Sequence, residues 1–242
     1  MKAAVISDIH SNLEALQAVL KDIKKRRIKK IICLGDLVGY GANPNECVDL
    51  CLKESDIIIA GNHDWAAIGK TDIGHFNPVA AEAIRWTKKR LTDASVDKLK
   101  SLPLTDKLSD IFLAHASPKN PAEWNYLTSF VDFQDAFGYF EGKICFIGHT
   151  HIPGAAFQDA NSYTDFLHET PFPLIPKRRF IINSGSVGQP RDLDPRACYA
   201  IYDGNNNSLE IIRIEYNIPL AEQKIIEAGL PEVLAQRLSI GK

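Results

Sequence analysis

Short apolar runs alternate with longer amphipathic segments over the first third of the chain. Residues 3–6, 31–34 and 56–60 are mostly apolar and rich in β-branched side chains, which is typical of buried strands. Residues 13–23 and about 44–53 lie between them and carry apolar side chains at helical spacing. This strand–helix–strand–helix–strand order predicts right-handed crossovers and a largely parallel sheet.

The pattern then predicts more helix, followed by more strand. Residues 65 to about 106 are mostly helical in character, and Ser11 with Glu14 predicts a capping box at the start of the first helix. Further short apolar runs predict strands at residues 111–114, 143–147, 180–183, 197–202 and 209–214. Two short helices are predicted at residues 219–228 and 231–238. No linker or repeat interrupts the pattern, so we expect one domain over residues 1–242.

Polar side chains collect where these predicted strands end. Functional groups of parallel sheets gather at the carboxyl ends of the strands, so we expect these side chains to converge. The candidates are Asp8, His10, Asp36, Asn62, His63, His115, His149 and His151. Each cluster taken alone also fits a polar turn, and a lone strand-end histidine is more often structural.

The residue types in this set favour metal binding. Imidazole and carboxylate together suit transition metals such as Mn, Fe, Co, Ni or Zn, and the set contains no thiolate. Apart from His63, these nitrogen and oxygen donors are too many for one ion and fit two ions that share a carboxylate. Two ions about 3.5–4 Å apart suit an in-line displacement at phosphorus, because they acidify a bridging water and neutralise phosphoryl oxygens. A spare imidazole can protonate the leaving group.

Composition narrows the class of protein. The chain has 242 residues, 45% hydrophobic content and a formal net charge of −2, which gives no electrostatic footprint for nucleic acid or an anionic membrane. The five cysteines are odd in number and scattered, which favours a reduced, intracellular protein. Neither a signal peptide nor a membrane-spanning stretch is present, so we expect a cytoplasmic protein. No sequence feature fixes its oligomeric state.

The clusters resemble the five blocks of the calcineurin-like metallophosphoesterases. The blocks occur in family order as Asp8-x-His10, Gly35-Asp36, Gly61-Asn62-His63-Asp64, His115 and Gly148-His149-Thr150-His151. Residues 35–41 and 183–191 also resemble a small bacterial and archaeal branch labelled phosphodiesterase or diadenosine-tetraphosphatase-related. One departure is Ser184, where that branch usually has proline, and the loop should be looser for it.

The resemblance implies a fold and a set of residue roles. The fold is an α/β four-layer α/β/β/α sandwich of two mixed sheets flanked by helices. One metal would be held by Asp8, His10, Asp36 and His151, and the other by Asp36, Asn62, His115 and His149, with Asp36 bridging. His63 would be the acid or the phosphate-stabilising imidazole, and Asp64 its orienting partner.

The sequence therefore predicts a two-metal phosphoesterase in which a metal-bridging hydroxide attacks a phosphodiester or nucleotide-type phosphate directly. Alternative substrates are a dinucleoside polyphosphate or a serine/threonine phosphoprotein. Alternatives of other kinds are a metal-dependent nuclease, which the near-neutral charge disfavours, and a catalytically silent binding or scaffold protein.

Four regions around the predicted site keep more than one interpretation. Arg191 fits either a bidentate phosphate contact or an ion pair with Asp192 or Asp194. Tyr40 fits either stacking on a base or loop packing. The aromatic residues of 124–140 fit core packing or a pocket wall, and residues 158–176 fit an exposed loop or a hairpin over the site.

Overall fold

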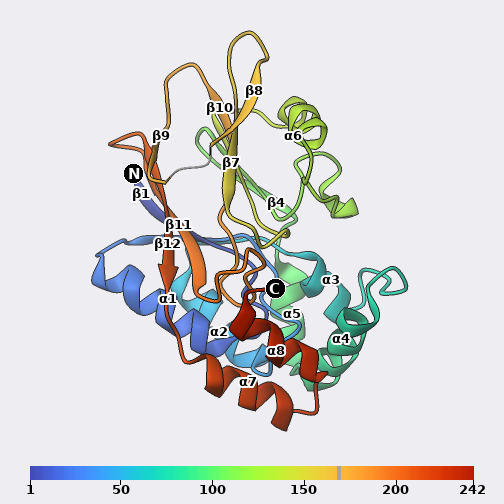
Figure 1. Ribbon diagram of the computed structural model, residues 1–242. Coiled ribbons are helices and arrows are strands. Elements are labelled where there is room, and N and C mark those ends of the chain that lie inside the picture. Colours follow the sequence, from blue (N-terminus) through green and yellow to red (C-terminus); the bar gives the residue numbers. More distant parts are fainter. Residues whose placement is uncertain (168–169) are drawn as a thin grey trace.

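Two six-stranded mixed sheets form the frame of the protein in the computed structural model, which describes residues 1–167 and 170–242 (Figure 1). The first sheet has the order β3 (Ile57–Ile58), β2 (Lys30–Cys33), β1 (Lys2–Ile6), β11 (Ala197–Asp203), β12 (Ser208–Ile214) and β9 (Phe172–Pro173). The second has the order β4 (Thr105–Leu108), β5 (Ile111–Ala114), β6 (Ile144–Ile147), β10 (Arg179–Asn183), β7 (Gly154–Gln158) and β8 (Thr164–Leu167). Parallel pairing is confined to β1–β2–β3 and β5–β6–β10.

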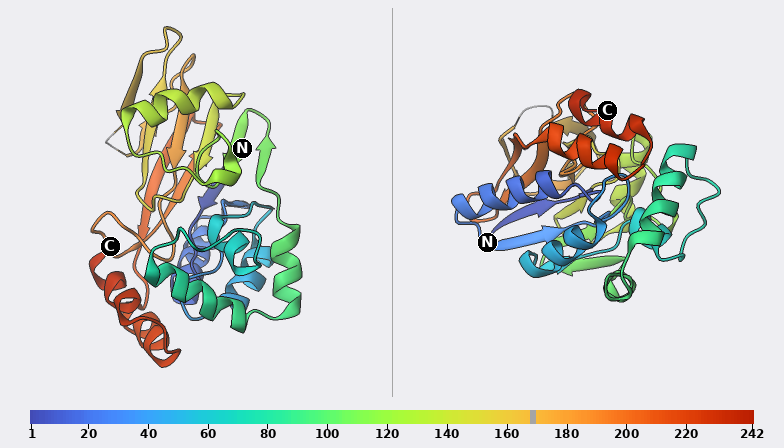
Figure 2. Two further views of the ribbon diagram at one scale, coloured as in Figure 1. Left: turned by 90° about the vertical axis from the view of Figure 1, so that its right-hand side faces the viewer. Right: turned by 90° about the horizontal axis from the view of Figure 1, so that it is seen from below.

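Helices cover the outer face of each sheet. The helices are α1 (Leu13–Lys25), α2 (Pro44–Glu54), α3 (Asn62–Ala67), α4 (Pro78–Arg90), α5 (Asp93–Ser101), α6 (Phe130–Ala136), α7 (Ile218–Glu227) and α8 (Glu232–Ile240). Short 3₁₀ turns occupy Pro121–Glu123 and Phe137–Tyr139. The helices α1 and α2 pack on the first sheet, whereas α6 crosses the outer face of the second (Figure 2). Among the described residues, no helix has the length and apolar character needed to cross a membrane.

Strand alternation explains why the core has layers. Successive side chains of a strand point to opposite faces, so Ala3 and Val5 of β1 pack between the sheets while Ala4 and Ile6 pack against the helices. A third apolar cluster lies between the second sheet and α6. This arrangement is the predicted α/β/β/α sandwich, with a mixed rather than largely parallel first sheet. All five cysteines are free and buried in these layers.

One local prediction is wrong, and one of two alternatives for another segment is excluded. The cap of α1 is Asn12, whose side chain accepts from the Ala15 amide, because Ser11 has a left-handed backbone (φ 54°) and its amide bonds to Leu37 instead. Residues 158–176, apart from 168–169, which lie outside the described residues, do include the expected hairpin, formed by β7 and β8. Its turn lies at the far end of the sheet from the strand ends that carry the candidate residues, so it does not cover them.

Candidate metal centre

The carboxyl ends of five parallel strands bring the predicted residues to one place. Asp8 and His10 follow β1, Asp36 follows β2, and Asn62 and His63 open α3 after β3. From the second sheet, His115 follows β5, and His149 and His151 follow β6. All of them are at most 7% exposed, so the two sheets enclose a buried polar cluster between their ends.

The loops that carry these side chains have an unusual backbone. Left-handed φ values between 49° and 66° occur at Asp8, His10, Asp36, His149 and His151. Residues with a Cβ rarely adopt this conformation, and where they do the surrounding structure has to hold them. Here the Asp8 amide bonds to the Gly35 carbonyl at 3.0 Å, and the His10 amide bonds to the Asp36 carbonyl at 2.9 Å.

Two glycines allow the loops to approach one another closely. A Cβ on Gly61 would overlap the Asp36 carboxylate, and a Cβ on Gly148 would overlap Ser7 Oγ at the junction of the two sheets. The freed space lets the His63 amide donate to Asp36 Oδ1 at 2.8 Å. Both glycines therefore serve close packing around the carboxylates rather than an unusual φ.

Possible ligand atoms fall into groups around Asp36. Within 4.8 Å of one another lie the atoms of three groups: Asp8, His10 and His151; Asp36, His115 and His149; and His10, Asp36 and His63. Asp36 Oδ2 is 3.6 Å from His10 Nε2 and 3.3 Å from His115 Nε2, so this carboxylate faces both sides. Asn62 Oδ1 lies 3.2 Å from His115 Nε2.

Backbone carbonyls fix the tautomers of three imidazoles. A backbone carbonyl oxygen can only accept a hydrogen bond, so the Nδ1 atom that contacts it carries the proton. The Nδ1-to-oxygen distances are 3.1 Å from His10 to Val38, 2.8 Å from His115 to Leu34 and 2.6 Å from His151 to Gln189. In each neutral ring the lone pair is then on Nε2, which points to the centre. Nε2 of His10 and Nε2 of His151 are only 3.0 Å apart.

Burial keeps most of these imidazoles neutral. It lowers the pKa of His63 to about 4 and that of His149 to about 3, and it holds the pKa values of His10 and His151 well below the usual value. Two neutral lone pairs that face each other at 3.0 Å repel unless a cation lies between them. Buried His149 Nε2 has no hydrogen-bond partner among the described residues. The donor set therefore fits divalent metal ions.

Carboxylates reverse this trend at one position. Burial alone would lower the pKa of His115, but the charges of Asp36 and Asp8 raise it to about 10. Burial would likewise raise the pKa of Asp36, but His115 and His63 hold it well below its usual range. In the metal-free centre a proton on His115 Nε2 thus occupies the place where a cation would bind.

The Asp64 carboxylate accepts hydrogen bonds from backbone amides and does not contact the imidazole of His63 through a hydrogen bond. The donors are the amides of Gly61 (2.9 Å), Leu37 (2.9 Å) and Val38 (3.3 Å). Burial raises its pKa to about 7. Buried Nδ1 of His63 has no partner among the described residues and lies against Gly39, where a Cβ would overlap it. Any orienting effect of Asp64 on His63 therefore passes through the loop that carries Asp36.

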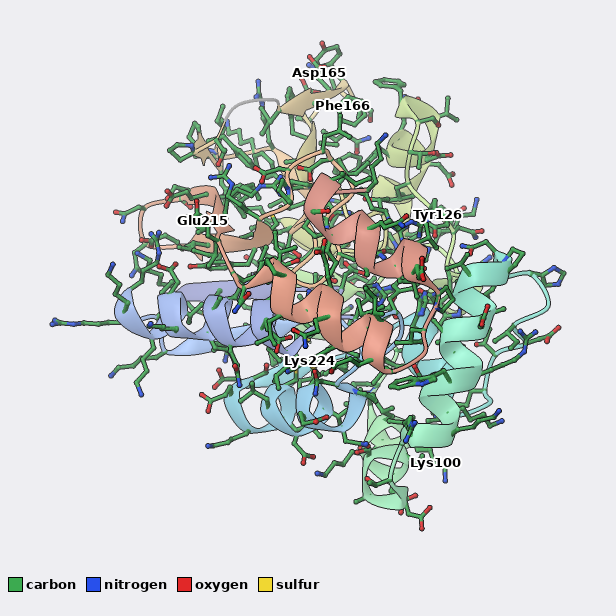
Figure 3. All side chains as sticks on the ribbon, turned by 60° about the horizontal axis from the view of Figure 1, so that its bottom comes forward. Lys100, Tyr126, Asp165, Phe166, Glu215 and Lys224 are labelled. Atoms are coloured by element: carbon green, nitrogen blue, oxygen red, sulfur yellow. The ribbon has the colours of Figure 1, made fainter. Side chains whose placement is uncertain are left out.

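Arg191 and two tyrosines form the rim of the centre. Arg191 donates to Gln189 Oε1 at 3.0 Å and to the Tyr40 hydroxyl at 3.3 Å. Its charge contributes to the low pKa values of His10 and His151. Tyr126, labelled in Figure 3, stacks on His149 with ring centroids 4.0 Å apart.

Contacts at the rim bear on two interpretations that the sequence left open. Asp192 pairs with Arg213, and Asp194 pairs with Arg196 and Arg213, so neither aspartate pairs with Arg191. Tyr40 packs against the C-terminal helices, as the loop-packing interpretation expects, and its ring also contacts those of His10 and His63.

The aromatic stretch divides between core and site. Phe137 and Phe140 pack into the core beneath α6. The Trp124 ring instead packs edge-to-face with the His115 ring, with 5.9 Å between the ring centroids, and Tyr126 reaches the rim. The sequence left both interpretations open for this aromatic run and did not single out Trp124 or Tyr126 as the residues that reach the site.

Comparisons with known proteins find related chains that match along most of the length of this one. The profile of the calcineurin-like phosphoesterase superfamily domain matches residues 1–207. The uncharacterized protein MJ0912 of Methanocaldococcus jannaschii is 48% identical over 244 residues, which cover 99% of this chain and 98% of that protein. The crystal structure of a metallophosphoesterase from Sphaerobacter thermophilus superposes with a TM-score of 0.87 and 39% identity, over 100% of this chain and 99% of that one. A hypothetical protein from Pyrococcus horikoshii OT3 shares the fold, with a TM-score of 0.79 and 22% identity over 100% and 98% of the two chains.

Proposed function

Because this chain belongs to the calcineurin-like phosphoesterase superfamily, we propose that it hydrolyses a phosphodiester or nucleotide-type phosphate with the help of two divalent transition-metal ions. Water attacks phosphorus directly, and no residue becomes phosphorylated. The observation that carries the proposal is the pair of imidazoles of His10 and His151. Their fixed tautomers direct two lone pairs at one point in a buried, carboxylate-rich centre.

Each of the two proposed ligand sets draws residues from both sheets. Asp8, His10 and His151 would hold one ion, and Asn62, His115 and His149 would hold the other, with Asp36 shared. Bound divalent ions of this kind supply Lewis acidity, which polarises phosphoryl oxygens and makes water more acidic. The carbonyls that bind Nδ1 of three imidazoles keep these side chains oriented before any ion arrives.

His63 is the residue proposed to act on the leaving oxygen. Its Nδ1 is turned against Gly39, which leaves Nε2 as the atom that faces the substrate. The neutral ring can carry a proton on Nε2 and donate it in a hydrogen bond to a phosphoryl oxygen or to the departing one. Tyr40 and Phe76 contact the ring at 4.5 and 5.4 Å between centroids and limit its rotation.

Arg191 is proposed to bind the phosphate from the rim. Its guanidinium does not pair with either nearby aspartate, and neutral oxygens of Gln189 and Tyr40 hold it in place. A guanidinium held in this way matches the bidentate geometry of phosphate oxygens. The combination of buried metal ligands and a cation at the rim suits an anionic ester better than a neutral substrate.

Hydrolysis of two chromogenic esters tests this proposal. Metal-stripped protein is supplied singly with Mn, Ni, Co, Zn or Mg and assayed on bis(p-nitrophenyl) phosphate and p-nitrophenyl phosphate. We expect metal-dependent turnover that Asp36→Asn and His63→Ala each reduce at least about 100-fold, the range for loss of a general acid or a metal ligand's charge. His75→Ala, at an exposed histidine, is the control. Protein that binds metal but turns over neither ester would favour a binding protein instead.

A further inference from the structure

A groove of about 550 Å³ lies beside the rim of the candidate metal centre. Its walls come from the start of β7, the end of β8, the strand β12 and the segment before α6. Gly154, Phe166 (labelled in Figure 3) and Ile211 represent three of these walls. The volume falls within the range of roughly 300–1,000 Å³ that is usual for small-molecule sites.

The groove and the centre share their loops. Leu127 lines the groove and directly follows Tyr126, which stacks on His149. Thr150 lines the groove between the two imidazoles of the Gly-His-Thr-His loop. Asp192 lines it and directly follows Arg191. These three pairs of chain neighbours place one edge of the groove next to the loops that carry the residues of the centre.

The polar side chains of the groove already have partners. Thr150 Oγ1 accepts from Asn183 at 2.9 Å, Thr170 Oγ1 accepts from the Ile211 amide at 2.9 Å, and Asp192 pairs with Arg213. The remaining surface of the groove is largely apolar. In it the Phe166 and Phe133 rings pack edge-to-face, with 5.2 Å between their centroids. A ligand held here gains from apolar contact and ring packing more than from new hydrogen bonds.

We propose that this groove binds a flat aromatic substituent carried by the phosphate ester. The inference rests on the proposed phosphate site and deepens it, because it assigns the ester's organic group to a place outside the metal ligands. Phosphates with an aromatic group should therefore bind better than those with a small alkyl group of the same charge.

Gly154 offers a direct way to fill the groove. Among the residues that the structure describes, a Cβ at this position meets nothing within 4 Å, so Gly154→Leu should fold and project its side chain into the groove. The matched control is Gly138→Leu, because a Cβ there also meets open space and Gly138 does not line the groove. The ligands are phenylphosphonate and methylphosphonate, which share the charged group and lack a bond that the enzyme could hydrolyse.

Binding to the Mn-supplemented full chain is measured by calorimetry, so that the result does not depend on turnover. We expect phenylphosphonate to bind at least about tenfold more tightly than methylphosphonate in the unaltered protein and in Gly138→Leu. Gly154→Leu should remove most of that preference and leave methylphosphonate binding unchanged. Equal constants for the two ligands, no binding of phenylphosphonate, or a preference that survives in Gly154→Leu would overturn the inference. Absence of ester hydrolysis would count against the proposed activity alone.

Discussion

His115 links metal binding to pH. Its ring carries a proton in the metal-free centre because Asp36 and Asp8 raise its pKa to about 10, and a cation has to displace that proton. Apparent affinity for Mn should therefore rise as the pH increases from about 6.5 to 8.5, by up to about tenfold per pH unit for one displaced proton. Calorimetry in buffers of different ionisation enthalpy measures the proton release.

The same titration with His115→Asn is the control. The variant should bind metal more weakly and release fewer protons, since the displaced proton is gone. Equal proton release by the variant and the unaltered protein would show that another group supplies the proton.

Arg191 should contribute mainly to substrate binding. Arg191→Lys keeps the charge but loses the planar fork that Gln189 and Tyr40 hold in place. We expect KM for bis(p-nitrophenyl) phosphate to rise about tenfold, the equivalent of one charge-assisted hydrogen bond, with a smaller change in kcat. The matched variant Arg196→Lys alters an arginine that pairs with Asp194 and should leave KM unchanged. A fall in kcat with constant KM would contradict a binding role.

At the level of single residues, the sequence predicted the types and positions of the clustered side chains. Strand-end placement follows from apolar periodicity, and the family blocks then assigned roles. The left-handed backbone at Asp8 or His149 has no sequence signal, because neither residue type requires it. The tautomer of His10 depends on the Val38 carbonyl, which lies distant in sequence. Such contacts depend on how loops of different strands meet.

The C-terminal helices support the rim from outside. The apolar faces of α7 and α8 pack with Tyr40, and Lys224 of α7 (Figure 3) pairs with Glu14 of α1. Leu234→Ala removes a buried side chain of this cluster and should lower the free energy of unfolding by about 2–5 kcal/mol. The neighbouring Val233→Ala, at an exposed position on the same helix, should change it by less than about 0.5 kcal/mol. Both free energies are measured by denaturant unfolding. If the two variants lost similar amounts, the buried packing of Leu234 against this cluster would be contradicted.

At the level of elements, the two terminal helices and the β11–β12 hairpin were predicted correctly, because Gly and Pro mark their ends. The cap of α1 was not, since the Ser11 amide joins the loop of Asp36 and leaves capping to Asn12. For residues 158–176 the sequence left an exposed loop or a hairpin over the site, and the β7–β8 hairpin is present but lies away from the site. Periodicity describes a strand but not which end of a sheet its turn occupies.

The centre should also stabilise the whole molecule. Its candidate ligands come from both sheets, so an ion that binds Asp8 and His151 joins the two halves of the sandwich. A ligand at about 100 times its Kd adds about 2.7 kcal/mol, which corresponds to a rise in Tm of roughly 5–10 °C for a protein of this size. Scanning calorimetry with and without Mn measures it. Asp8→Asn should reduce the shift and His75→Asn should not, whereas equal shifts would place the stabilising ion elsewhere.

The most direct test of the account is the turnover of bis(p-nitrophenyl) phosphate as a function of Mn bound per chain. Both quantities are measured on the same samples, with bound metal determined by elemental analysis. A two-ion centre predicts little activity up to one equivalent and full activity at two, with His115→Asn limited to the low plateau. Full activity with one Mn bound per chain, or with no Mn bound, would contradict the two-ion centre.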